Sequence, residues 1–380
     1  MKRKLRPFRL ILVVLAALAA LGLMVAIFYF GLLERSSEAV LTEVSIPPGH
    51  QYVINGRVIA YLTDTALVTY NTDARRRPQA EHTLQTLPTG FDLLTPIENK
   101  SIQFAAFSGS SLQIFGQSTL QLNGEIADLR CGKSHVAVLR RNTSRGNDSI
   151  VVFNASGNEI SDTPDYSDGQ VVDFGFYVSD SVGSEHELLW VIVVSLRASK
   201  PVYTVKWFEY AGSGTTSYLP PFYDQAVERL YITDDSVFVI GTQDIFRYPI
   251  LGGRGREAYR VGIYGQRVAD MMETDAGVSF LLIPRQDPQN QTLRILNVSE
   301  SDESGESLVT VHLQEPFIAA LFSDSVLQVY SLTKLLTFNM NGRQILDMEL
   351  TQVPLRVHKL DGGEFVLFET AAACYLASIQ

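Results

Sequence analysis

The hydrophobic positions of this chain follow two different patterns. Residues 10–33 are uncharged and predominantly apolar, whereas after Arg35 apolar runs of five to nine residues alternate with turn residues. At about 1.5 Å per residue, a helix over the first region is about 36 Å long, which exceeds the ~30 Å hydrocarbon core of a membrane. The pattern predicts a transmembrane helix at 10–33 and a separate domain at 34–380.

The charges that flank residues 10–33 predict the orientation of this segment. Glu34, Arg35 and Glu38 follow it, whereas the tail at 1–9 contains the basic residues Lys2, Arg3, Lys4, Arg6 and Arg9. By the positive-inside rule, the tail is cytoplasmic and the C-terminal domain lies outside the cell. A cleavable signal peptide is the alternative, but its apolar core ordinarily has about 7–15 residues. We therefore expect an uncleaved signal-anchor that crosses the cell membrane once.

The apolar runs after Arg35 have the length and composition of β-strands. Val58–Leu62, Ser149–Phe153 and Leu189–Leu196 are examples rich in Val, Ile, Leu and Phe, which suit a pleated and half-buried surface. Regular strands with short turns over more than 300 residues are typical of a sandwich array, a solenoid or a propeller. The sequence thus predicts an all-β exterior domain.

Internal repeats favour the propeller. Phe153–Ile160 and Phe338–Ile345 share the spacing F-N-x-x-G-x-x-I and begin 185 residues apart, and Tyr70–Asp73 is a degenerate copy. The separation equals about four periods of 46 residues, within the range of four-stranded propeller blades. Each copy predicts a strand, a tight turn whose Gly takes positive φ, and a returning strand.

The last repeat predicts how the ring closes. Counted by their opening strands, the units number eight, and the last one, from Pro354 to Gln380, has room for only three strands. Residues 39–46 form a spare strand-like segment shortly after the anchor. Pairing this segment beside the last unit removes two exposed strand edges. We therefore predict a β-propeller of eight four-stranded blades closed by residues 39–46, with seven blades as the alternative.

The repeated turns resemble those of the quinoprotein-like propellers, which are built on WD40/PQQ-like repeats. Phe153–Ile160 and Phe338–Ile345 carry the likeness, although the Ala-Leu-Asp before the turn and the Trp after the Gly are missing. The chain therefore resembles a degenerate member. With its basic tail, single span and acidic propeller, it is similar over its whole length to uncharacterised membrane-anchored propeller proteins of Firmicutes. The resemblance implies a propeller fold and brings no activity with it.

Composition excludes several kinds of function. The net charge is −10, and an acidic body argues against nucleic acid as a partner, because neutralising phosphates needs clustered Lys and Arg. The two cysteines exclude a disulfide scaffold and a Cys-cluster zinc site. The chain has no G-x-S-x-G motif, and its six histidines are scattered singly; we expect His135 and His358 to be hydrogen-bonded core residues or to lie between blades. We predict no enzyme and no cofactor.

One acidic constellation carries a binding hypothesis. Aligning the opening strands places five carboxylates at one register, namely Asp92, Asp128, Asp173, Glu228 and Asp270. Opening strands of blades line the central channel, so these groups would form an arc that favours a divalent cation or a polyamine-like ligand. In the alternative, each Asp caps its own turn or bonds the backbone of the neighbouring blade. We expect the second arrangement.

A loop rich in aromatic residues is the other candidate. Tyr218, Phe222 and Tyr223 flank two prolines between the fourth and fifth units, and exposed rings in a loop suit contact with sugar or peptide. The alternative is that the loop folds its rings onto the rim of the fourth blade.

The function that these features favour is non-catalytic binding. We expect a membrane-tethered extracytoplasmic propeller that acts as a binding or scaffold module for a protein or an envelope polymer. One alternative is a propeller enzyme, either a quinone-dependent dehydrogenase or a carbohydrate-active hydrolase. Another is an assembly factor that guides envelope proteins by strand addition at a blade edge.

Overall fold

The computed structural model describes most of the domain that follows residue 38. It covers residues 39–379 except 56, 73–77, 85, 95–102, 115–118, 143–146, 163–168, 180–185, 210–215, 250–258, 275–276, 287–290, 300–306, 324 and 361–365. The predicted tail at 1–9 and the predicted transmembrane helix at 10–33 lie outside these residues. Within the part described, no helix is long and apolar enough to cross a membrane.

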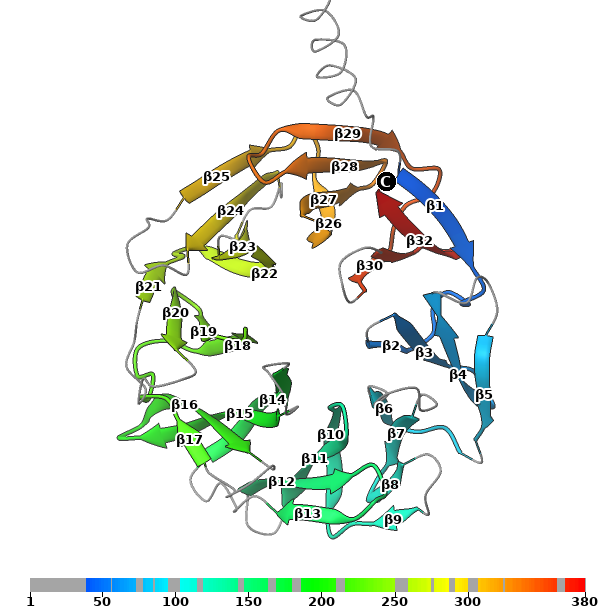
Figure 1. Ribbon diagram of the computed structural model, residues 1–380, viewed down its shortest axis with the longest axis vertical. Coiled ribbons are helices and arrows are strands. Elements are labelled where there is room, and N and C mark those ends of the chain that lie inside the picture. Colours follow the sequence, from blue (N-terminus) through cyan, green and yellow to red (C-terminus); the bar gives the residue numbers. More distant parts are fainter. Residues whose placement is uncertain are drawn as a thin grey trace, which may run out of the picture.

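The described strands form a closed ring of blades (Figure 1). Thirty-two strands in this part of the chain make eight antiparallel sheets of four strands each. This confirms the prediction of an all-β propeller with eight four-stranded blades, and the alternative of seven blades is wrong. Each blade runs from a first strand beside the central channel to a fourth strand at the outer wall.

The first four blades contain β2 to β17. Blades 1 and 2 consist, in chain order, of β2 (Tyr52–Asn55), β3 (Val58–Leu62), β4 (Ala66–Asn71), β5 (Pro78–Thr83), β6 (Gly90–Leu94), β7 (Gln103–Ser108), β8 (Ser111–Ile114) and β9 (Leu120–Gln121). Blades 3 and 4 consist of β10 (Glu125–Cys131), β11 (His135–Asn142), β12 (Asn147–Asn154), β13 (Glu159–Asp162), β14 (Gly169–Ser179), β15 (His186–Arg197), β16 (Lys200–Glu209) and β17 (Thr216–Tyr218).

The other four blades contain the remaining strands, including the first one of the described chain. Blades 5 and 6 consist of β18 (Val227–Ile232), β19 (Ser236–Gly241), β20 (Asp244–Pro249), β21 (Tyr259–Gly262), β22 (Gln266–Thr274), β23 (Gly277–Pro284), β24 (Thr292–Ser299) and β25 (Ser307–His312). Blades 7 and 8 consist of β26 (Phe317–Ser323), β27 (Val326–Ser331), β28 (Lys334–Asn339), β29 (Gln344–Glu349), β30 (Arg356–Lys359), β31 (Val366–Glu369), β32 (Cys374–Ile379) and β1 (Ala39–Val44).

The core consists of apolar layers between neighbouring blades. Because side chains alternate between the two faces of a strand, β11 sends Val136 and Val138 toward blade 2 and sends Ala137 and Leu139 toward blade 4. The second strand of a blade is therefore apolar on both faces, and all six residues of β19 are buried. Fourth strands such as β29 alternate between exposed and half-buried residues, as expected at an outer wall.

The repeated F-N-x-x-G-x-x-I turns have the same structure in blades 3 and 7. In each copy the Asn side-chain oxygen accepts hydrogen bonds from the N–H groups two and four residues later, at 2.9–3.1 Å. Gly157 and Gly342 take φ values of +80° and +76°, which glycine adopts without a steric cost. Both turns join the third and fourth strands of their blades, four blades apart as the spacing predicts.

The ring closes through a sheet that joins both ends of the described chain. β1 pairs with β32 over six residue pairs, from Ala39 with Ile379 to Val44 with Cys374, and so supplies the fourth strand of blade 8. Val44 and Ile46 are buried against blades 8 and 1. At the same joint, the buried carboxylate of Glu369 accepts hydrogen bonds from the N–H of Gly49 and, at 3.4 Å, from the hydroxyl of Tyr52.

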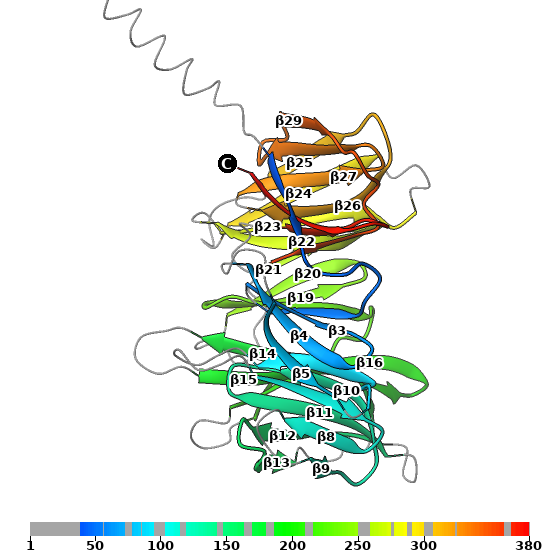
Figure 2. The same ribbon diagram turned by 90° about the vertical axis from the view of Figure 1, so that its right-hand side faces the viewer.

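The topology gives the two faces of the ring different roles. One side of the ring carries the connections between successive blades and the turns between the second and third strands of each blade. We call this side the connector face. Figure 2 shows the hairpin of β15 and β16 pointing to this side, while β32 ends on the other side. Since β1 runs antiparallel to β32, β1 begins on the face opposite the connector face.

Candidate functional site

The first strands of the blades share an irregularity near their start. β10, β14, β18, β22 and β26 each contain one extra residue, so that the register against the second strand shifts there. The residue after this bulge is Asp128 in blade 3, Asp173 in blade 4 and Asp270 in blade 6. Bulges re-aim the side chains that follow them, and here they bring the predicted carboxylates to equivalent positions.

Glu228 does not share this register. It is itself the bulged residue of β18, and Arg229 takes the position that Asp holds in blades 3, 4 and 6. The alignment of opening strands is therefore off by one residue in blade 5, because a sequence comparison without the pairing cannot show which residue a bulge inserts. The carboxylate of Glu228 instead forms an ion pair with Arg285, at 2.6 Å.

Two of the predicted carboxylates bond the backbone of the next blade. Asp92 accepts hydrogen bonds from the N–H of Leu93 at 2.9 Å and from the N–H of Cys131 in blade 3 at 2.6 Å. Asp270 accepts one from the N–H of Phe322 in blade 7 at 2.7 Å. Cys131 lies three residues after Asp128, and Phe322 lies three residues after Ala319, which follows the bulge of β26 as Asp128 follows that of β10. The two bonds therefore join equivalent points of adjoining first strands.

The other two Asp residues make local contacts. Asp128 and Asp173 each accept a hydrogen bond from the N–H of the next residue, at 2.8 and 2.9 Å. Asp128 also pairs with Arg130 at 3.0 Å. These contacts and those of Asp92 and Asp270 are of the kind expected from turn capping and inter-blade bonding.

Cations lie among the channel carboxylates. Arg130 pairs with Asp128, Lys359 lies 3.5 Å from Asp270, and Arg229 interacts electrostatically with Asp173 and Asp270. The arc is therefore mixed in charge, which reduces the mutual repulsion that would favour a bound cation. Among the described residues, no three His, Cys, Asp or Glu side chains are grouped so as to hold a metal ion.

The channel environment raises the pKa of two carboxylates, Asp92 and Asp173, and burial is the main cause for both. Burial raises the pKa of Asp92 to about 6 from its ordinary 3.8, while the hydrogen bonds from Cys131 and Leu93 and the charge of Arg130 act in the opposite direction. Desolvation prevails because burial penalises only the charged form.

The aromatic loop after β17 is divided between the core and the surface. Phe222 is buried, pairs by its backbone with Tyr203, and packs its ring edge-on against Phe246 at 5.1 Å. Tyr223 is 54% exposed. Tyr218 ends β17, and its side chain lies outside the described set. Phe222 thus fixes the connection between blades 4 and 5, and Tyr223 presents a ring to solvent.

A polar cluster between blades 3 and 4 was not predicted. Glu187 of β15 reaches the turn between β10 and β11, where its buried carboxylate accepts hydrogen bonds from the N–H of Lys133, from the N–H and hydroxyl of Ser134, and contacts Nδ1 of His135. Gly132 leaves the necessary space, since a Cβ there would lie 1.7 Å from a Glu187 oxygen. The sequence contains the run Gly-Lys-Ser-His at 132–135. Its partner Glu187 lies 52 residues after His135, so the pairing becomes visible only in the fold.

This cluster resembles a hydrolytic triad only in composition. In a Ser-His-Glu triad, the nucleophile and the acid contact opposite nitrogens of the imidazole. Here Ser134 and Glu187 both contact Nδ1 of His135, and Ser134 also donates directly to Glu187 at 2.9 Å. The arrangement therefore fastens blade 3 to blade 4 and does not activate a nucleophile. His358, the other predicted inter-blade histidine, packs edge-on against Tyr52 of blade 1 at 5.0 Å.

Most of the exposed large apolar side chains lie on the connector face. Of the twelve large apolar residues that are exposed in the described part of the chain, nine lie on this face or at its edge. Seven lie in or next to its connections and turns, namely Leu87, Leu196, Tyr223, Tyr264, Leu332, Val353 and Leu355, and two, Val172 and Ile318, are the bulged residues near the start of β14 and β26. The other three, Ile160, Leu308 and Ile345, lie on fourth strands at the outer wall. Single exposed apolar residues are normal on a protein surface, and these nine are distributed around the ring; the two faces differ in that the connector face holds most of them.

The hairpin of β15 and β16 is the most prominent part of this face. Its strands are twelve and ten residues long, and Leu196 near the tip is 75% exposed, next to the cross-strand pair of Arg197 and Lys200. The turn residues Ala198 and Ser199 take φ values of +50° and +63°. Such a turn ordinarily uses Asn-Gly, and each residue with a side chain costs about 1–2 kcal/mol there. Strain of this kind persists where the surrounding structure fixes it and often marks a functional position.

Comparison with known proteins supports the fold. No family model matches the chain, and no curated protein matches it. Among solved structures, the AfRom2 CNH domain has a TM-score of 0.43 and 8% identity, covering 90% of this chain and 99% of that chain. A structure described as a crystal structure of the eukaryotic initiation factor has a TM-score of 0.51 and 12% identity, covering 83% and 90%. At this identity, the second likeness shows a shared fold alone.

The inter-blade role of Glu187 can be tested by stability. Glu187→Gln replaces one accepting oxygen by an NH₂ group that only donates. This group would face the N–H groups of Lys133 and Ser134, which also donate. We expect the free energy of unfolding to fall by about 1.5–3 kcal/mol. Glu125→Gln, at an exposed position of β10, is the matched control and should change it by less than about 0.5 kcal/mol. Urea denaturation measures both, and equal effects would contradict the role assigned to Glu187.

The raised pKa of Asp92 predicts a pH-dependent stability. Because this pKa is about 6 in the folded protein and 3.8 ordinarily, the folded state binds the proton more tightly. The stabilisation is complete below about pH 4 and is lost as the pH rises through 6. Relative to Asp92→Asn, whose amide does not titrate, the wild-type free energy of unfolding should fall between pH 4 and pH 7.

The neighbouring cation provides a second arm of this test. Arg130→Gln removes a charge that lowers the pKa of Asp92, so the transition measured for Asp92 should move to higher pH. Denaturation at pH 4, 5, 6 and 7 gives the difference in the free energy of unfolding between wild type and Asp92→Asn at each pH, and the same measurement is made with Arg130→Gln in both chains. A difference that stays flat or rises with pH would show that Asp92 is not desolvated as described.

Proposed function

We propose that this chain is a membrane-tethered extracytoplasmic β-propeller that binds a protein partner through its connector face and catalyses no reaction. The observation that carries the proposal is the presence of nine exposed large apolar side chains on that face or at its edge. Exposed apolar surface of this kind favours association with another protein, because burying it removes about 25 cal/mol per Å² of unfavourable contact with water.

Two parts of this face are the strongest anchors for a partner. Leu196 and Tyr264 are 75% and 70% exposed, and large apolar or aromatic side chains at the centre of an interface commonly supply most of its energy. Leu332, Val353 and Leu355 lie on adjoining segments, since the N–H of Leu350 donates to the carbonyl of Thr333 at 2.7 Å. They extend the apolar surface over blades 7 and 8.

The proposed membrane tether is consistent with this use of the connector face. β1 begins on the opposite face, so a spanning segment at residues 10–33 would turn the connector face away from the membrane and leave it accessible. A cytoplasmic tail at 1–9 and a single-pass anchor in the cell membrane are part of this proposal. So is kinship with the membrane-anchored propeller proteins of Firmicutes, which rests on the basic tail, the apolar segment and the repeated turns.

Site-specific crosslinking in intact cells tests the proposal. The full chain carries the photocrosslinker p-benzoylphenylalanine in place of Leu196 or Tyr264, and in place of Ile345 at the outer wall as a matched control. We expect discrete covalent protein adducts from positions 196 and 264 and at least tenfold less adduct from position 345. Equal yields from all three positions, or no protein adduct from the connector face, would contradict the proposed function.

A further inference from the structure

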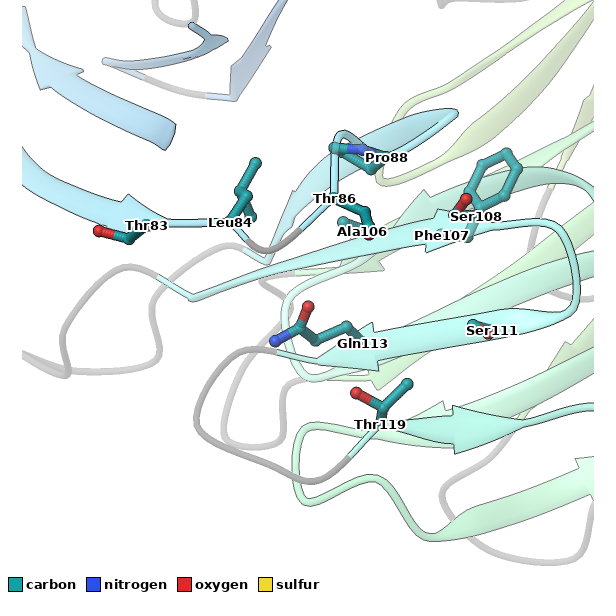
Figure 3. Close-up of a pocket in the computed structure, with 10 residues that line it drawn as sticks. All are labelled: Thr83, Leu84, Thr86, Pro88, Ala106, Phe107, Ser108, Ser111, Gln113 and Thr119. Atoms are coloured by element: carbon teal, nitrogen blue, oxygen red, sulfur yellow. The ribbon is translucent and has the colours of Figure 1, made fainter. Parts of the chain in front are cut away.

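A cleft lies between the outer parts of blades 1 and 2, apart from the channel (Figure 3). Its volume is about 460 Å³, within the ~300–1,000 Å³ typical of ligand sites. Thr83 at the end of β5 and Leu84, Thr86 and Pro88 of the connection that follows form one wall, and blade 2 forms the other. The fourth strand of blade 2, β9, has only two residues and follows directly after the lining residue Thr119.

Close packing fixes the floor of the cleft. The N–H of Thr89 donates to the carbonyl of Phe107 at 2.7 Å, which ties the connection to β7. Gly90 lies against the Phe107 ring, and a Cβ at this glycine would lie 2.6 Å from that ring. A side chain at position 90 would therefore displace either the ring or the wall, so glycine holds the two sides of the cleft at their present spacing.

The lining offers hydrogen bonds without charge. None of the ten residues that line the cleft is ionisable. Five of them, Thr83, Thr86, Ser108, Gln113 and Thr119, have side chains that hydrogen-bond no other residue in the described part of the chain. Ser111 accepts a hydrogen bond from Gln121 at 2.7 Å. Hydroxyl and amide groups both donate and accept, so these five side chains give the cleft donors and acceptors that no described residue uses.

We propose that this cleft binds an uncharged oligosaccharide. Sugar hydroxyls also donate and accept, and they match the hydroxyls of Thr86 and Thr119 and the amide of Gln113. The apolar wall at Leu84 and Pro88 complements the C–H faces of sugar rings, as in ligand sites that combine apolar surface with a few placed polar groups. An ionic ligand finds no counter-charge here, and the net charge of −10 repels anionic polymers.

The class of ligand distinguishes this site from the proposed protein-docking surface. A peptide segment is recognised chiefly through main-chain pairing at a strand edge, through a groove for a helix, or through charged ends. The cleft offers side-chain hydroxyls and an amide as its recognition groups, which suits a ligand whose own polar groups are hydroxyls. This inference does not depend on a partner at the connector face.

Calorimetric titration of the full chain tests the proposal. The protein is purified in a detergent without a sugar headgroup and titrated with cellotetraose, maltotetraose and chitotetraose, and separately with an uncharged tetrapeptide blocked at both ends. The variant Thr86→Val/Gln113→Leu removes hydrogen-bonding groups from both walls with little change in volume. Thr351→Val, at an exposed position between blades 7 and 8, is the matched control.

We expect at least one of the three oligosaccharides to bind. The double variant should weaken its binding at least tenfold, Thr351→Val should leave it unchanged, and both variants should melt at the wild-type temperature. The proposal is overturned if none of the oligosaccharides binds, if the double variant binds as tightly as wild type, or if the peptide binds more tightly than every sugar. Crosslinking at positions 196 and 264 reports separately on the connector face.

Discussion

Pairing between β1 and β32 is the constraint on which the rest of this propeller depends. The six residue pairs join the first strand of the described chain to the last, so the eight blades hold one another in a ring and β32 of blade 8 has no unpaired outer edge. The connector face, the channel and the cleft between blades 1 and 2 are each built from neighbouring blades. Their geometry therefore follows from the closure, because an open ring would let the blades move apart.

Carboxylates fasten the joints between blades, and this explains part of the acidic composition. Asp92, Asp148, Glu187, Asp270 and Glu369 each accept a hydrogen bond from a backbone N–H of an adjoining blade or of the connection that enters it. A charged acceptor strengthens such a bond, and a buried N–H without a partner is costly. These five acidic residues therefore hold adjoining blades together. The surfaces that offer unused contacts, the connector face and the cleft, are mainly apolar or uncharged.

The sequence predicts the fold well and the sites poorly, for a physical reason. Strand periodicity and turn chemistry are local, so Phe153–Ile160 and Phe338–Ile345 predict their turns, and the three-stranded last unit predicts the extra strand from the N-terminal side. The polar cluster around Glu187 joins residues 52–54 positions apart. The connector face takes its exposed apolar residues from blades 4 and 7 and from four connections between blades. Such groupings depend on how blades are placed. The bulge that separates Glu228 from the Asp register likewise becomes visible only in the pairing.

Thermal unfolding of two shortened chains tests the closure most directly. One chain begins at residue 36 and keeps β1, and the other begins at residue 50 and lacks β1 with the buried Val44 and Ile46. Losing these two side chains alone removes about 3 kcal/mol or more, so the second chain should melt at least ~5 °C lower or aggregate. The first should unfold in one cooperative transition. Identical melting of the two chains would contradict the claim that β1 holds the ring closed.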